Sequence, residues 1–296
     1  MKYLGKWLAA FGEAPFSRYP LRVTLSVVLI TQDEEANLPR TLASIMPLVR
    51  DGRGEIIVVD SGSTDRTVEV AKSFGAKIFV EPWKGFAAQK NSAIEKASGD
   101  WVLQLDADES LEPELAEEIE TALKPGSEFK GFWLRRKNFF LGRWIRHGGF
   151  YPDPKLRVIR RGAGRFEEYG AHPTIKVEGK TEFLKHALVH NAYPTLRGYI
   201  DHMNSYSSSG AELAVEKGYR QFSVINIVAR PLLTFIYNYF FRLGFLDGRE
   251  GLLLHLYHSV YVSWKYAKAW EQGRKPKEPT PACDDSEVPI SSKQDG

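Results

Sequence analysis

The sequence predicts an α/β protein whose core is a doubly wound, mostly parallel sheet. Four apolar, β-rich segments occur at 24–31, 54–62, 76–82 and 101–107, and helical spacing follows each of them. The resulting order β-α-β-α-β-α-β-α favours parallel strands that are joined by crossover helices. The first, second and fourth segments also end in acidic clusters, which places the candidate chemistry at one edge of the sheet.

Each predicted element has a local reason. The first strand, TLSVVLIT, is continuously apolar, as strands buried on both faces are. The helix in STDRTVEVAKSFG has Ser63 or Thr64 as its predicted cap and Gly75 as its end. The third helix, GFAAQKNSAIEKASG, ends near Gly99, and the fourth, EPELAEEIETALK, has an acidic face.

The pattern changes near residue 129. Short strands rich in arginine and aromatic residues are expected next, and helical spacing dominates from about 196 to 271. We therefore expect four parts along the chain. They are a lead-in at 1–21, an α/β domain at 22–195, a helical extension at 196–272 and a disordered tail at 273–296.

Composition narrows the possible functions. The chain of 296 residues carries 40 Lys and Arg against 37 Asp and Glu, and this near balance argues against nucleic acid as a partner. Its single cysteine, Cys283, excludes an intramolecular disulfide. The most apolar segment, 223–245, is interrupted by residues such as Asn226 and Arg230, so no clear membrane span is expected.

The acidic clusters predict a metal site. Ligands of open parallel sheets bind at the carboxyl ends of strands, where TQDEE, DSGSTD (60–65) and DADE (106–109) would meet. Mg²⁺ and Mn²⁺ prefer carboxylate oxygens and leave positions open for substrate phosphates, so Asp106 and Asp108 are candidate ligands. A metal there would hold a diphosphate leaving group. Two alternatives stay open: DADE as a solvated acidic turn, and DSGSTD as a helix cap only.

Two further stretches carry candidate residues. WKGFAAQKN places Lys84, Gln89 and Asn91 around a helix start, where phosphate binds well, and an ordinary surface helix is the alternative. RFEEYGAHP contains Glu167 and Glu168, and a glutamate after a turn could serve as a general base.

Several segments together resemble family 2 glycosyltransferases. They are SVVLITQDEEANLPRTLASI, EIIVVDSGSTDRTVEVAKSFGAKIF, WKGFAAQKNSAIEKASGDWVLQLDADE and GFLDGREG. The combination of DSGSTD, W-x-G-x-x-x-Q-x-N and DADE resembles, more narrowly, the branch of lipopolysaccharide-core glucosyltransferases that act on heptose. The resemblance covers about residues 22–270. It implies a GT-A fold, a nucleotide-sugar donor, a divalent metal and inversion at the anomeric carbon.

The resemblance also implies a nucleoside site. Asp60 would contact the nucleoside, and the loop around Thr31, Asp33 and Glu34 would form a wall of the base pocket. Asp33 stands where asparagine is usual, and Ser61 stands where many members carry a second aspartate. These departures leave the base of the donor unassigned, with UDP as the expected carrier.

The remaining donor contacts follow in the same way. Asp106 would face the ribose and the metal-bound diphosphate, and Asp108 would be the direct metal ligand. Gln89 and Asn91 match a motif of the branch and would line the donor site.

The proton acceptor is less well defined by the sequence. An inverting transfer needs a carboxylate that takes the acceptor hydroxyl's proton while the diphosphate leaves on the opposite face of the sugar. The candidates are Glu168, which we favour, and Glu167 and Asp153. Relatives often have His-Glu where this chain has His172 and Pro173, so a base at that second position is missing.

The function expected is metal-dependent transfer of a hexose, glucose from UDP-glucose, onto a lipopolysaccharide-core or other lipid-linked saccharide. A polyprenyl-phosphate or another glycan is the alternative acceptor. The basic strip in 135–147 would contact an anionic acceptor or lipid headgroups, or would be only a solvated face. The stretch 223–270 would lie as an amphipathic hairpin in the cytoplasmic face of the inner membrane, or pack as a buried helix pair.

Two other classes are remote alternatives. LQLDADES also resembles the signature of phosphatases that use an aspartyl nucleophile, but about a hundred residues of α/β sequence precede it here. A non-catalytic protein that binds nucleotide sugars is the other alternative, and the intact acidic pair argues against it.

Overall fold

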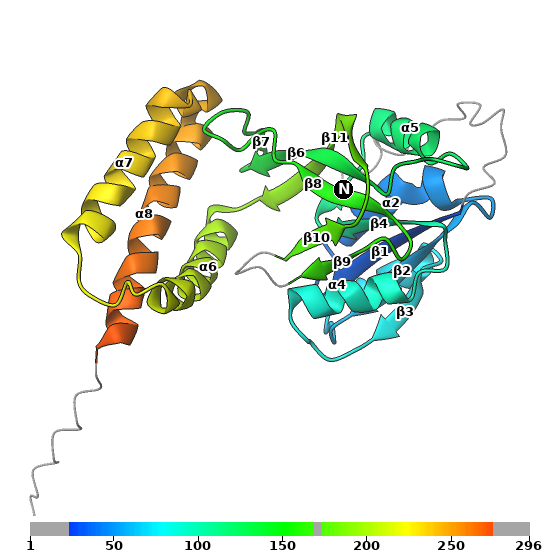
Figure 1. Cartoon of the computed structure of the whole chain (residues 1–296), viewed down its shortest axis with the longest axis horizontal. Helices are drawn as coiled ribbons and strands as arrows, with labels where there is room; N and C mark the ends of the chain where they lie inside the picture. The colour runs from blue at the N-terminus through cyan, green and yellow to red at the C-terminus, as the bar shows by residue number, and fades with distance from the viewer. Residues whose placement is uncertain (1–23, 168–172, 275–296) are drawn as a thin grey trace, which may run out of the picture.

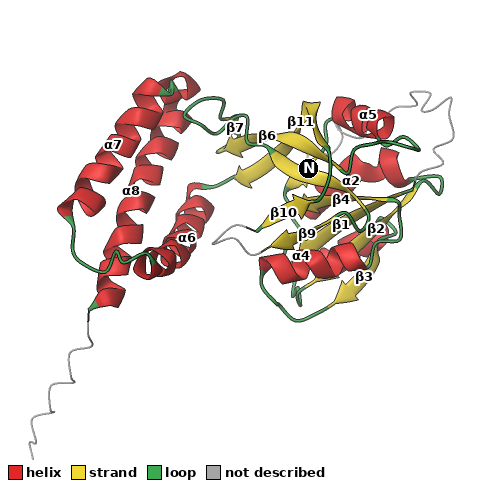
Figure 2. Ribbon diagram, in the orientation of Figure 1, coloured by secondary structure: helices red, strands yellow, loops and turns green. Residues whose placement is uncertain are grey.

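The computed structural model describes residues 24–167 and 173–274. The predicted lead-in and almost all of the predicted tail lie outside these ranges. The described chain forms an α/β body around one nine-stranded sheet, with a group of helices at one end (Figure 1, Figure 2).

The N-terminal half is the predicted alternation. Four parallel strands lie in the order β3-β2-β1-β4, with β4 as the link to the rest of the sheet. The strands are β1 (Leu25–Thr31), β2 (Gly54–Asp60), β3 (Lys77–Val80) and β4 (Trp101–Asp106). The helices between and after them are α2 (Leu38–Val49), α3 (Thr67–Ser73), α4 (Phe86–Glu95) and α5 (Pro113–Ala122).

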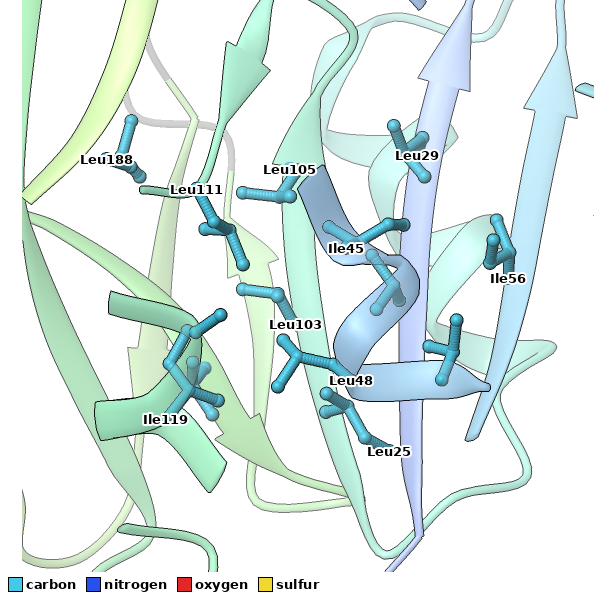
Figure 3. Packing of buried hydrophobic residues seen from close by; sticks show 14 of the residues in the cluster. Leu25, Leu29, Ile45, Leu48, Ile56, Leu103, Leu105, Leu111, Ile119 and Leu188 are labelled. Carbon is cyan, nitrogen blue, oxygen red and sulfur yellow. The ribbon is translucent and has the colours of Figure 1, made fainter. Parts of the chain in front are cut away.

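Helices cover both faces of this half, so the doubly wound prediction is confirmed. On one face, α2 and α5 pack against the sheet through a cluster that includes Leu29, Ile45, Leu103 and Ile119 (Figure 3). On the other face, α4 packs through a second cluster in which Ala93 is buried with strand residues. The continuous apolar runs follow from this burial, because most side chains of β1, β2 and β4 are covered on both faces of the sheet.

The second half of the sheet is mixed rather than parallel. The strand β8 (Lys155–Arg160) pairs antiparallel with β4, and β6 (Gly131–Phe140), β11 (Thr181–Tyr193) and β5 (Glu109–Ser110) follow in that order. β6 pairs antiparallel with β8 but parallel with β11. β7 (Arg143–Trp144) pairs with β6, and β9 (Gly164–Glu167) and β10 (Thr174–Val177) form a separate ribbon. Because no helix separates β6 from β8, the chain returns antiparallel.

The helical group begins with α6 (Leu196–Glu216) and ends with the long α8 (Gly248–Gly273). Between them lie π-helical turns η1 (Ile225–Ala229) and η2 (Tyr237–Phe241) on either side of α7 (Arg230–Ile236), and the 3-10 turn η3 (Gly244–Asp247). Both α6 and α7 pack on α8, with α7 on the side away from the sheet (Figure 1).

The outer helices expose much apolar surface. Phe241 is 75% exposed, Ile225 70% and Leu233 63%. Within residues 24–167 and 173–274, no helix combines the length and the apolar character needed to cross a bilayer. The expectation that these helices associate with a membrane stays a prediction.

Candidate active site

The candidate site lies where β1, β2 and β4 end. The strand register places Asp60 beside Thr31 and Asp106 beside Ile30, so the acidic ends of neighbouring strands share one edge of the sheet. This convergence is the arrangement that the strand pattern predicts.

Asp60 organises the loop that follows β2. Its carboxylate, only 1% exposed as a residue, accepts hydrogen bonds from Thr31 Oγ1 at 2.9 Å and from the backbone N–H groups of Gly62 and Ser63 at 2.9 and 2.8 Å. The Ser63 hydroxyl donates a further bond to it. Both carboxylate oxygens are therefore used inside the protein. A direct contact between Asp60 and a nucleoside stays a prediction.

Asp33 joins the first loop to the second. Its φ of +52° is left-handed, a conformation that aspartate and asparagine tolerate better than most residues. Its side chain accepts the N–H of Thr64 at 2.7 Å, and its own N–H donates to Ser63 Oγ at 2.9 Å. The cap predicted for α3 is wrong: Asp65, rather than Ser63 or Thr64, accepts the N–H of Thr67.

Glu34 lies in the same loop and faces the metal-site candidates. Its N–H donates to Thr67 Oγ1 at 2.7 Å, and its carboxylate accepts from Asn37 at 2.9 Å. Burial is the main cause that raises the pKa of Glu34, and the charges of Asp108 and nearby acids add to it. The hydrogen bond from Asn37 opposes this shift. The role of Glu34 in the wall of a base pocket stays a prediction.

Asp106 is saturated by cationic partners. One carboxylate oxygen accepts from Lys90 Nζ at 2.6 Å and Gln104 Nε2 at 3.1 Å, and the other pairs with Arg157 at 2.7 Å. Burial by itself would raise the pKa of Asp106, but the charges of Arg157 and Lys90 hold it well below its usual value. The role of Asp106 as a metal ligand stays a prediction. Its three contacts hold its carboxylate in one position.

Asp108 has a different partner. Its Oδ2 lies 3.1 Å from Nε2 of His190 on β11. Burial opposes ionisation, but His190 keeps the pKa of Asp108 below its usual value. On the other side of the ring, His190 Nδ1 lies 2.7 Å from Oδ1 of Asn138.

The bonds of Asn138 indicate that Nδ1 of His190 carries a proton. The amide nitrogen of Asn138 donates to the Phe150 carbonyl at 3.0 Å and to Asp153 at 3.2 Å, so its oxygen faces His190 and Nδ1 donates to it. A neutral His190 then has only a lone pair at Nε2, which a carboxylate at 3.1 Å repels unless a proton or a metal ion lies between them.

The pair Asp108–His190 therefore fits a divalent ion. Within the described ranges, no three His, Cys, Asp or Glu side chains are grouped as a complete cage. Mg²⁺ is usually bound by one or two protein ligands and takes the rest from phosphates and water, so a pair is sufficient. The sequence reasoning missed His190, because it stands in a strand far along the chain with no motif around it.

Glu109 overturns the alternative of a solvated acidic turn. It is 0% exposed, it pairs with Arg157 and with Arg136 at 3.1 Å, and it accepts the N–H of Asp106. Arg136 was expected to be part of a basic acceptor-binding strip, but it points inward and also pairs with Asp153 at 2.6 Å. Removing one partner from a buried ion pair typically costs about 3–5 kcal/mol, so these arginines hold the acidic loop in place.

The base candidates separate by their surroundings. Burial opposes ionisation of Asp153, yet Arg136 and Lys155 lower its pKa to about 2, which makes it a weak proton acceptor. Glu167 ends β9, pairs with Lys176 and is 42% exposed at the side chain. Glu168 and His172 lie outside the described residues, so the assignment of the base to Glu168 stays a prediction.

The motif on α4 divides into different roles. Lys84 is exposed and pairs with Glu81 at 2.9 Å. Asn91 forms two bonds with the backbone of Phe166, at 2.9 and 2.7 Å, and so attaches α4 to β9. Gln89 is 0% exposed, and neither polar atom of its amide has a partner in the described chain. A buried amide without partners is costly, which marks Gln89 as a candidate contact for a ligand.

Comparisons with known proteins agree with this geometry. A family model described as glycosyl transferase family 2 matches residues 26–174. The chain is 29% identical to the lipopolysaccharide core biosynthesis glycosyltransferase LpsC of Rhizobium meliloti, over 85% of this chain and 93% of the relative. It is also 29% identical to an uncharacterized glycosyltransferase of Rickettsia typhi, over 77% of this chain and 80% of the relative.

A solved structure shares the fold. It is a mannosyltransferase from Pyrobaculum calidifontis, determined with GDP-mannose and Mn²⁺, with a TM-score of 0.50 and 16% identity over 90% of this chain and 93% of that one. The expected GT-A fold is confirmed by this likeness. The acidic strand ends, the buried loop network and the family match over residues 26–174 lead to one conclusion: the chain is a member of glycosyl transferase family 2.

Proposed function

We propose that this glycosyltransferase moves a hexose from a nucleotide sugar to a saccharide of the lipopolysaccharide core, in an inverting reaction that requires a divalent metal. The observation that carries the proposal is the Asp108–His190 pair, whose carboxylate oxygen and ring nitrogen lie 3.1 Å apart at the end of β4, where both could bind one cation. The likeness to LpsC over 85% of this chain supports the acceptor class.

The residues around that pair would have different roles in the reaction. Asp108 and His190 would hold Mg²⁺ or Mn²⁺, which supplies positive charge to the diphosphate as it leaves. Lys90 and Arg157 hold the Asp106 carboxylate from two sides, at the end of β4. Glu168 would take the proton from the attacking hydroxyl.

The donor would lie across the ends of β1 and β2, with UDP-glucose as the proposed species. The loops there are joined by Asp33 and Asp60, so they form one rigid wall beside the metal pair. Gln89 could give its unused amide bonds to the donor. A rigid, preformed wall lowers the entropy lost when a nucleotide binds.

The outer helices support peripheral binding at the cytoplasmic face of the inner membrane. Apolar side chains such as Val228, Leu232 and Phe240 are each more than half exposed, and the exposed Arg230 and Arg242 lie among them. Apolar side chains with nearby cations suit an anionic lipid interface. A lipid-linked saccharide would be met there, and a polyprenyl-phosphate acceptor stays the alternative.

The test is turnover of a panel of nucleotide sugars with Mn²⁺ or Mg²⁺, with and without lipopolysaccharide-core acceptor. Asp108→Ala and His190→Ala should each lower turnover at least about 100-fold, since each removes a ligand of the ion. Glu69→Ala, which removes an exposed acid on α3, is the matched control and should behave as wild type. Full activity of Asp108→Ala would overturn the metal assignment.

The phosphatase alternative finds no support in the geometry. Its nucleophile would be Asp106, and both carboxylate oxygens of that residue are already bound by Lys90, Gln104 and Arg157. Release of phosphate from a monoester in the absence of nucleotide sugar would revive it.

A further inference from the structure

A cavity of about 350 Å³ lies between α6 and α8, outside the metal site. Its lining includes Tyr206, Tyr219, Tyr261 and Tyr266 together with Lys217 and Lys265. The volume falls in the range of small-molecule sites, which is about 300–1,000 Å³. Four of the nine residues that line it are tyrosines.

The aromatic lining suits a saccharide. A sugar ring presents apolar C–H groups on its faces and hydroxyls at its edge, and tyrosine offers a matching apolar ring with a polar tip. Tyrosine also loses little conformational freedom when it binds, because its side chain has few rotatable bonds. Tyr219 and Tyr266 already pack edge to face, with ring centroids 5.5 Å apart, so part of the lining is preformed.

The two lysines lack a counter-charge. Lys265 Nζ lies 4.8 Å from the ring centre of Tyr266, and no carboxylate in the described ranges pairs with it or with Lys217. Lys268, one turn further along α8, shows the contrast: its ammonium donates to Asn204, Ser207 and Ser208. Two lysines without an acidic partner in the described chain line the same cavity, which favours an anionic ligand.

Gly210 keeps the stem of Lys265 in position. A Cβ at Gly210 would lie 2.9 Å from Cδ and 3.2 Å from Cγ of Lys265. Glycine inside a helix costs about 1 kcal/mol relative to alanine, and here the missing side chain lets the lysine cross α6 closely. The lysine is therefore held against α6 at the cavity.

The cavity is connected to the metal site by aromatic side chains. The ring of Tyr193 lies 5.5 Å from that of His202, and His202 lies 4.0 Å from Tyr206. Tyr193 also lines a second cavity of about 140 Å³ together with His190. Burial first, and then the charge of Asp106, raises the pKa of Tyr206, which places this cavity wall near the catalytic carboxylates.

We propose that the cavity between α6 and α8 binds the acceptor: a saccharide that carries a phosphate or carboxylate group, with its sugar rings on the tyrosines and its anionic group on Lys217 and Lys265. The inference rests on the proposed function, because it takes the reaction centre to be the Asp108–His190 pair. The track from Tyr206 through His202 to Tyr193 would lead the accepting end of the saccharide to that centre.

The experiment measures equilibrium binding without donor, using the full chain and deacylated lipopolysaccharide-core oligosaccharide as the probe, with its phosphates intact or removed. The variant Lys217→Met/Lys265→Met keeps the apolar stems. It should bind the phosphorylated probe at least about tenfold more weakly than wild type, and the dephosphorylated probe as wild type does. Lys72→Met, an exposed lysine on α3, is the control and should bind both probes normally. Thermal unfolding establishes that each variant is folded.

A second probe separates a saccharide from a lipid headgroup. Vesicles of phosphatidylcholine and phosphatidylglycerol should bind the double variant and wild type equally, because the exposed apolar helices rather than this cavity would contact them. Equal affinity of the double variant and wild type for the phosphorylated probe would overturn the proposal, as would a loss confined to vesicle binding. If wild type bound the probe but turned over no nucleotide sugar, the proposed function would fail while the cavity assignment stood.

Discussion

The sheet end and the helical end of the molecule differ in which side chains they bury and which they expose. At the strand ends of the sheet, charged groups are buried and paired: Glu109 with Arg136 and Arg157, and Asp106 with Lys90 and Arg157. In the helical group, apolar side chains such as Phe241 are exposed, and Lys265 lacks an acidic partner in the described chain. The first region pairs its buried charges within the protein, which suits a preorganised site. The second region leaves apolar side chains exposed to solvent.

The largest expected effect is at Arg157. Arg157→Met should lower the free energy of unfolding by about 3–5 kcal/mol, because Glu109 and Asp106 lose a shared buried partner. Urea unfolding measures this. Arg197→Met, at an arginine whose side chain is 93% exposed with Asp201 at 3.8 Å, is the matched control and should change stability by less than about 1 kcal/mol. Similar values for the two variants would show that the paired region is not held by its charges.

The next effect is the pH dependence of stability that arises from His255, where the helical group packs against the sheet domain. His255 on α8 is 1% exposed, packs against Phe150, and neither ring nitrogen has a partner in the described chain. Burial is the main cause that lowers the pKa of His255 to about 4. The positive charges of His258 and Arg242 act in the same direction, and Asp247 opposes them. Since an unfolded histidine titrates near 6.5, the unfolded state binds more protons between about pH 6.5 and 4.

Stability should therefore fall as the pH drops through this window, by up to about 3 kcal/mol from His255 alone. The check is the difference in unfolding free energy between wild type and His255→Leu, measured at pH 7 and pH 4.5. Wild type should lose more than the variant does. Parallel losses would assign the pH dependence to other groups.

Asn138 tests the alignment of the metal pair. Asn138→Ala removes the acceptor that orients His190 Nδ1, so metal affinity should fall about 10–100-fold. Mn²⁺ titration measures it. Because Asn138 also bonds Asp153, thermal unfolding must accompany the titration. Unchanged metal affinity in a folded variant would mean that His190 is not a ligand.

The smallest effect on stability is expected on the outer helices. Leu233→Ser changes a side chain that is 63% exposed, so the free energy of unfolding should stay within about 0.5 kcal/mol of wild type. Co-sedimentation with phosphatidylglycerol vesicles should nevertheless decrease. Loss of stability with normal vesicle binding would make this surface part of the fold rather than a contact.

The predictable part of the fold is its local part. The parallel half follows from apolar runs and helical spacing within residues 24–106, where each strand is joined to the next by one helix. The same reasoning failed for the second half, where β8 inserts between β4 and β6 and β5 pairs at the far edge. Short apolar runs with arginines between them do not reveal such an order, because pairing there depends on partners distant in sequence.

The candidate site also has a part that the sequence predicts and a part that it does not. The sequence by itself determined that Asp60, Asp106 and Asp108 stand at strand ends that share one edge, because parallel strands joined by helices end on the same side. Only the tertiary structure decided their partners. His190 and Arg157 come from β11 and β8, which are distant in sequence and bring an imidazole nitrogen to Asp108 and a guanidinium group to Asp106. The charge of a side chain follows from its residue type, but tertiary packing determines which residue of opposite charge lies next to it.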